Sequence, residues 1–91
     1  MEYGESPEKE YAIKETIEKI KTAFESLPEI EAKVLELRFS EKMTLQEVAD
    51  ELKLSSKSRA RQKQELGLRR IQSGKLLSEE AYNYLVNGLG K

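Results

Sequence analysis

The sequence predicts an all-α fold, and three observations lead to that prediction. Apolar residues recur at steps of three and four in several segments, whereas no segment alternates apolar and polar residues as a half-buried strand does. Prolines and helix-capping residues separate these segments. The 91 residues, 37% of them hydrophobic, suit one domain over residues 1–91 with four to five short helices.

Two apolar stripes predict the first two helices. Ser6-Pro7-Glu8 combines a capping hydroxyl, a first-turn proline and an acid near the positive end of the helix dipole, so the first helix should begin there. Pro28 ends this helix and starts the second, which should end near Phe39. The first stripe, which we expect to be core, is Ile13, Ile17, Ile20, Phe24 and Leu27. The second is Ile30, Val34 and Leu37, flanked by Leu35.

Residues 44–72 predict a helix-turn-helix. Thr44 and Glu47 have the spacing of a capping box, which predicts a short third helix. Ser55-Ser56 can cap a longer, basic fourth helix that ends at about Gln72, before Ser73-Gly74. A short capped helix, a tight turn and a longer basic helix are typical of this motif.

A final helix is expected over residues 76–88, capped by Ser78 and ended by Asn87-Gly88. Tyr82, Leu85 and Val86 should cover the open side of the helical bundle. A dimer contact through Tyr82 and Tyr84 is the alternative for this helix.

The composition excludes several classes of site. The chain has no Cys and no His, which excludes disulfides, Cys/His zinc sites and His-based triads. Asp50 is the only aspartate, so no Asp-rich loop can bind a metal. Without a nucleophile–base pair or a phosphate loop, we expect no enzyme and no cofactor. No apolar run reaches about 18 residues and the first residues do not resemble a signal peptide, so we expect a cytoplasmic protein without a membrane partner.

The net charge of −1 conceals a segregation of charge. Residues 1–52 hold 14 acidic and 7 basic side chains, whereas residues 53–91 hold 3 acidic and 9 basic ones. Segregation of this kind is what a surface for nucleic acid or another anionic partner requires, although basic residues on a helix can also form a merely solvated face.

Three stretches resemble region 4 of the bacterial sigma-70 family: Leu27-Pro28-Glu29, residues 34–39 (VLELRF) and residues 43–52 (MTLQEVADEL). Arg59-Ala60-Arg61-Gln62 is similar to the Arg-x-Arg-Gln core of the family's recognition helix. The resemblance covers roughly residues 10–72. It implies a region 4-like core over residues 6–72, with the last helix as an addition.

The resemblance also implies the residues that contact duplex DNA. Thr44, Leu45 and Gln46 would offer a helix N-terminus to a phosphate, and Arg38 would approach the same backbone. In the family, the recognition helix contacts the −35 element, and the corresponding residues here are Arg59, Arg61 and Gln62. Lys57 and Ser58 precede them, at the positions where the family has arginine and glutamate. Arg69 and Arg70 correspond to a later basic pair that contacts phosphates.

Helical geometry agrees in part with these assignments. Ser58, Arg61, Gln62, Glu65 and Arg69 share one helix face, which would enter the major groove. Arg can bond guanine and Gln can bond adenine, and each good pair contributes about 1–3 kcal/mol of discrimination.

The sequence departs from the family at four places. The stretch from Leu54 to Arg59 is one residue longer, and a helix that absorbed this residue would rotate its side chains by about 100°. Ser58 replaces the base-reading glutamate. Lys53 replaces the turn glycine. Lys63 stands where the family has isoleucine, and Gly67 lies in the predicted helix interior.

Two functions fit these observations. The first is a stand-alone transcription regulator, similar to small phage and prophage regulators, that binds duplex DNA together with RNA polymerase or another protein. The alternative is a protein-interaction module that does not read DNA and binds the polymerase β-flap, a sigma factor or an anti-sigma partner. A broken or dynamic 53–72 segment would favour the alternative.

Overall fold

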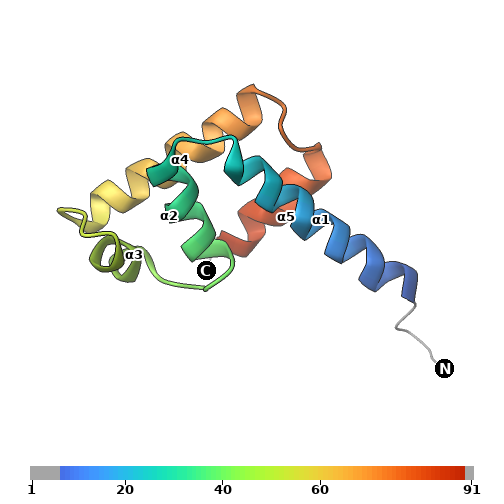
Figure 1. Ribbon diagram of the computed structural model, residues 1–91, viewed down its shortest axis with the longest axis horizontal. Coiled ribbons are helices and arrows are strands. Elements are labelled where there is room, and N and C mark those ends of the chain that lie inside the picture. The colour runs from blue at the N-terminus through green and yellow to red at the C-terminus, as the bar shows by residue number, and fades with distance from the viewer. Residues whose placement is uncertain (1–6, 90–91) are drawn as a thin grey trace.

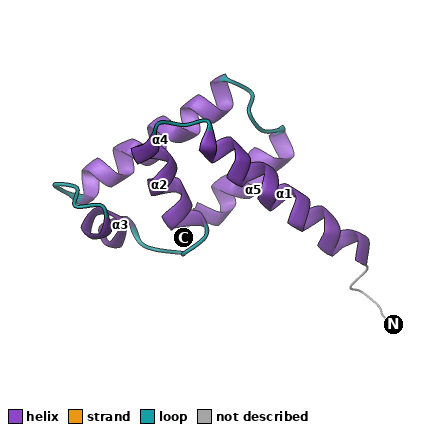
Figure 2. Ribbon diagram, in the orientation of Figure 1, coloured by secondary structure: helices purple, strands orange, loops and turns teal. Residues whose placement is uncertain are grey.

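The computed structural model describes residues 7–89, and all regular elements in that part of the chain are helices (Figures 1 and 2). This confirms the predicted all-α fold. Ser6, which was expected to cap the first helix, lies outside the described residues. The helices are α1 (Pro7–Glu25), α2 (Glu29–Phe39), α3 (Leu45–Glu51), α4 (Lys57–Ser73) and α5 (Glu79–Leu89).

The second helix organises the bundle, because α2 contacts each of the other four helices. Figure 1 shows α3 and the start of α4 at one end of the molecule, whereas the N-terminal half of α1 projects from the opposite end. The molecule is therefore elongated, with extents of 51 × 26 × 17 Å.

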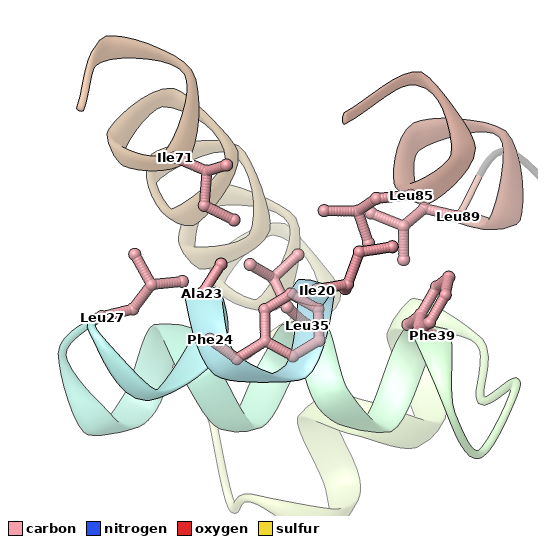
Figure 3. Packing of buried hydrophobic residues seen from close by; sticks show 9 residues of the cluster. All are labelled: Ile20, Ala23, Phe24, Leu27, Leu35, Phe39, Ile71, Leu85 and Leu89. Atoms are coloured by element: carbon pink, nitrogen blue, oxygen red, sulfur yellow. The ribbon is translucent and has the colours of Figure 1, made fainter. Parts of the chain in front are cut away.

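Two apolar clusters hold the helices together. The larger joins α1, α2, α4 and α5 around the fully buried Ile20, Leu35, Ile71 and Leu85 (Figure 3). The smaller joins α2, α3 and α4 through Val34, Val48, Ala49 and Ala60. The helix-turn-helix is thus packed against the same α2 that supports the rest of the bundle.

The apolar stripe of α1 is buried along only part of its length. Ile20, Phe24 and Leu27 are buried, but Ile17 is half-buried and Ile13 is 42% exposed. The prediction that the whole stripe is core is therefore wrong for its first turn. Ile13 belongs by sequence to the N-terminal half of α1, the half that projects from the other helices in Figure 1.

Lys53 takes the backbone conformation that its position in the turn requires. Its φ is +58°, in the left-handed region that favours glycine, and this conformation costs a side-chain-bearing residue about 1 kcal/mol. The adjoining Leu54 N–H donates to the Ala49 carbonyl (2.8 Å), which closes the end of α3. The helix-turn-helix therefore keeps its tight turn without a glycine.

The recognition helix is continuous from Lys57 to Ser73. The Ser56 hydroxyl accepts from the Arg59 N–H (3.3 Å), so both serines precede the helix and lengthen the turn instead of rotating the helix. The inner face consists of buried Ala60, Gly67 and Ile71, with Lys63 half-buried at its edge.

Gly67 marks the closest approach of α4 to α2. A Cβ placed there would lie 2.7 Å from Leu35 Cδ1 and 3.5 Å from Leu27 Cδ1. A glycine in a helix interior is unfavourable by about 1 kcal/mol relative to alanine. Here the absent side chain lets Leu35 of α2 pack directly against the α4 backbone, and a side chain at residue 67 would force a shift.

The last helix differs from its predicted bounds. It begins at Glu79, with the Ser78 hydroxyl accepting from the Ala81 N–H (3.2 Å), and continues through Leu89 instead of ending at Asn87-Gly88. Gly88 lies inside the helix, and a Cβ there would approach the Phe39 ring to 3.0 Å. The glycine therefore serves close packing and not helix termination.

We predict that Gly67→Ala destabilises the protein by about 1–2 kcal/mol in urea unfolding. Overpacking a full core costs about 1–3 kcal/mol, which exceeds the gain of about 1 kcal/mol in helix propensity. The control is the same change in a Leu35→Val background, which lacks Cδ1. There the added methyl should be tolerated better, and an equal loss in both backgrounds would contradict the explanation.

Candidate nucleic-acid interface

The start of α3 is fixed by the predicted capping box. The Thr44 hydroxyl accepts from the Glu47 N–H (3.1 Å), and a Glu47 carboxylate oxygen accepts from the Thr44 N–H (2.9 Å). Val48 and Ala49 on the inner face of α3 are buried against Val34 and Ala60. The first turn of α3 is therefore held at a defined position beside α2 and α4.

Five of the sequence-predicted DNA-binding residues line one hollow of about 310 Å³ at this point. They are Arg38, Thr44, Leu45, Gln46 and Lys57, which come from α2, the start of α3 and the start of α4. Two of them carry positive charge. The structure thus brings Arg38 and the start of α3, both assigned to the DNA backbone, to one place together with Lys57.

Arg38 links four parts of the chain. Its Nε donates to Gln64 Oε1 on α4 (2.9 Å), and its terminal nitrogens donate to the carbonyls of Met43 (2.9 Å) and Leu89 (2.8 Å). The guanidinium is partly buried, and this burial lowers the pKa of Arg38 from its ordinary value. Three of its five N–H groups serve these bonds, so two are not used by them.

A second hollow, of about 440 Å³, lies on the exposed side of α4. Four further predicted residues line it, Ser58, Arg59, Arg61 and Gln62, together with Ser55, Ser56 and Glu65. Arg61 Nε is 3.2 Å from Glu65 Oε2, and both side chains are exposed. An exposed pair of this kind contributes only about 0–1 kcal/mol, so Arg61 can exchange Glu65 for another acceptor.

The remaining predicted pair, Arg69 and Arg70, is divided between two sides of α4. Arg69 is exposed, whereas Arg70 Nε donates to Glu31 Oε1 on α2 (2.9 Å). The Glu31 side chain is only 5% exposed, while that of Arg70 is 56% exposed. Arg70 therefore compensates a buried carboxylate and keeps part of its guanidinium at the surface.

Sequence reasoning did not assign the side chains that pair with three arginines at this interface, namely Glu65, Glu31 and Gln64. Glu65 had a local signal, since it follows Arg61 by four residues and shares its helix face. Glu31 and Gln64 had none, because their arginine partners lie 39 and 26 residues away. Only the packing of α2 against α4 brings these partners together.

Other kinds of site find no support among the described residues. That part of the chain holds no group of three His, Cys, Asp or Glu side chains able to bind a metal ion. None of its helices is both long and apolar enough to cross a membrane.

A family model described as Sigma-70, region 4 matches residues 23–73, which is more than half of the chain. The chain therefore belongs to the Sigma-70, region 4 family, whose members are DNA-binding helix-turn-helix domains of transcription. Comparisons with curated proteins and with solved structures found no match. The matched range runs from the last turn of α1 to the end of α4, so most of α1 and all of α5 lie outside it.

We predict that Arg70→Ala lowers the free energy of unfolding by about 1–3 kcal/mol, because it leaves the buried Glu31 carboxylate without its cation. Adding Glu31→Gln to Arg70→Ala should recover part of this loss, since the amide carries no charge. Chemical denaturation of the two variants measures the difference. If Arg70→Ala left stability unchanged, Arg70 would have no structural role.

Proposed function

We propose that this domain is a transcription regulator that binds duplex DNA with α4 in the major groove and the start of α3 against the phosphate backbone. One observation carries the proposal: nine of the eleven residues assigned to DNA line two hollows, which both lie on the helix-turn-helix. Family membership supports the same class of partner, and it supports RNA polymerase as the protein with which the domain acts.

The hollow at the start of α3 is suited to a phosphate. Lys57 offers an ammonium group, and Arg38 offers the two N–H groups that its internal bonds do not use. Charge-assisted hydrogen bonds to phosphate are stronger than neutral ones. Because Arg38 is already held by three acceptors, little side-chain entropy is lost when it binds.

The hollow on α4 is suited to base edges. Arg61 and Gln62 are exposed there and can pair with guanine and adenine. Losing the exposed Glu65 pair costs at most about 1 kcal/mol, whereas a bidentate contact to guanine contributes about 1–3 kcal/mol. Exchange of Glu65 for guanine as the partner of Arg61 therefore favours DNA binding. Arg59 and Arg69 would contact phosphates on either side of this base contact. Arg70 would contact phosphate only through its guanidinium nitrogens that are not bonded to Glu31.

The continuous α4 also weighs against a domain that has lost DNA reading. The departures at Lys53 and Gly67 are accommodated by the turn and by the close approach to Leu35, and the recognition helix is intact. Its basic residues are exposed, except for Lys63, which is half-buried at the edge of the inner face.

We predict that the domain binds duplex DNA in a strongly salt-dependent manner, and that replacing Arg59 and Arg61 together by alanine abolishes most of this binding. The measurement is a fluorescence anisotropy titration at several salt concentrations, with a random duplex and a sigma-type −35 duplex. Lys33→Ala is the matched control, because Lys33 is an exposed cation on α2 outside both hollows. It should leave affinity unchanged.

Single variants separate base reading from phosphate contact. Arg61→Ala should reduce the preference between duplexes, whereas Arg69→Ala should weaken binding to both equally and flatten the salt slope by about one unit. Absence of binding at about 50 mM salt from a folded protein would contradict the proposal, because phosphate contacts are strong under those conditions.

A further inference from the structure

The last helix, α5, ends beside an arginine of the proposed DNA interface. We infer that Leu89, the last residue of α5, is a positioning residue for DNA binding, because its backbone carbonyl holds Arg38 at the hollow near the start of α3. The inference rests on the proposed function, in which Arg38 contacts a phosphate. It goes further, since α5 lies outside the range that the family model matches and lines neither hollow of the interface.

The contact between Arg38 and Leu89 joins two distant parts of the chain. A terminal nitrogen of Arg38 (Nη2) donates to the Leu89 carbonyl at 2.8 Å, the shortest of the three bonds that this guanidinium makes. The last four carbonyls of a helix have no donor within the helix, and they carry the negative end of the helix dipole. A cation is therefore favoured here both as a donor and as a charge. The two residues are 51 positions apart, so only the docking of α5 brings them together.

The Leu89 carbonyl has a defined position because the side chain of the same residue is anchored. Leu89 is only 5% exposed and belongs with Phe39 and Leu85 to the larger apolar cluster (Figure 3). The preceding Gly88 packs so closely that a Cβ there would lie 3.0 Å from the Phe39 ring. The last turn of α5 is thus fixed against the end of α2, the helix that carries Arg38.

The bond to Leu89 completes the fixation of the Arg38 guanidinium. Gln64 accepts from Nε, Met43 accepts from Nη1 and Leu89 accepts from Nη2, so all three nitrogens of the planar group are held. Without the Leu89 carbonyl, one N–H of a partly buried group would lose its acceptor, which is unfavourable unless the side chain turns to water. A guanidinium that has left its place must be ordered again when a phosphate binds, and this ordering weakens binding about two- to tenfold.

A purely structural role of Leu89 leads to a different expectation. If α5 only covered the core, a weakened α5 would lower DNA binding through loss of folded protein, whether or not Arg38 is present. If Leu89 acts through Arg38, its effect on DNA binding disappears when Arg38 is replaced. A double-mutant cycle separates the two cases. Tyr82 provides the matched control, because it packs against the same cluster from the first turn of α5 and makes no contact with Arg38.

The experiment measures the affinity of the full chain for a random duplex by fluorescence anisotropy at about 50 mM salt. Leu89→Ala should weaken binding about two- to tenfold in the otherwise unaltered chain, and it should have no effect in an Arg38→Met background. Methionine keeps an aliphatic stem and removes the donors, so this background should retain the fold, and circular dichroism verifies folding of every variant. Tyr82→Ala should leave affinity unchanged.

Exchange of the Arg38 Nε–H with solvent, followed by NMR, gives a second readout that needs no DNA. Leu89→Ala should speed this exchange in the free protein, whereas Tyr82→Ala should not. Equal losses of affinity in both backgrounds, tighter binding by Leu89→Ala, or an unchanged exchange rate would overturn the inference and leave the proposed function intact. Absence of binding by the unaltered chain would instead overturn the proposed function, and the exchange comparison would still decide whether Leu89 holds Arg38.

Discussion

Arg38 makes the interaction on which the arrangement of the helix-turn-helix depends. From the end of α2, its guanidinium joins the carbonyl before α3, the Gln64 amide of α4 and the last carbonyl of α5. No other side chain supplies enough planar donors to join all three. Hydrogen bonds to the Arg38 guanidinium therefore hold the start of α3 and the middle of α4 in fixed positions. The surface between these two helices has a defined shape as a result. The same group carries a positive charge and lines the hollow at the start of α3, so the contact that builds the surface also contributes to its charge.

The distance between α2 and α4 is the second constraint. Gly67 allows Leu35 to fill the space that a side chain would take, and the Arg70–Glu31 pair closes the same interface nearby. The recognition helix consequently needs few large apolar residues on its inner face. This explains how a helix with a half-buried Lys63 at its edge is still held firmly against the bundle. A polar inner edge and a close glycine contact together take the place of a broader apolar stripe.

Much of the architecture was predictable from local sequence signals. Periodic apolar residues, Pro28, the Thr44–Glu47 box and the capping serines located all five helices. Lys53 stands where the family has a turn glycine, and its backbone is left-handed. Properties that depend on distant parts of the chain were not predictable. Periodicity marked Ile13 as apolar but could not show that the covering helices end before it. Asn87-Gly88 resembled a helix end, because the Phe39 ring that requires this glycine is 49 residues away in the sequence. The hydrogen-bond partners of Arg38 and Arg70 were not predictable either, because they are also distant in the sequence.

The central claim is that Arg38 both organises the helix-turn-helix and lies at its DNA-binding surface. The most direct measurement is solvent exchange of the arginine Nε–H groups by NMR, with and without duplex DNA. The account predicts that the Arg38 Nε–H exchanges more slowly than that of the exposed Arg69 in the free protein, because Gln64 accepts it. It also predicts that the Arg38 and Arg61 signals shift when DNA is added. Exchange of Arg38 as fast as that of Arg69, or DNA-induced shifts confined to residues outside the two hollows, would contradict the account.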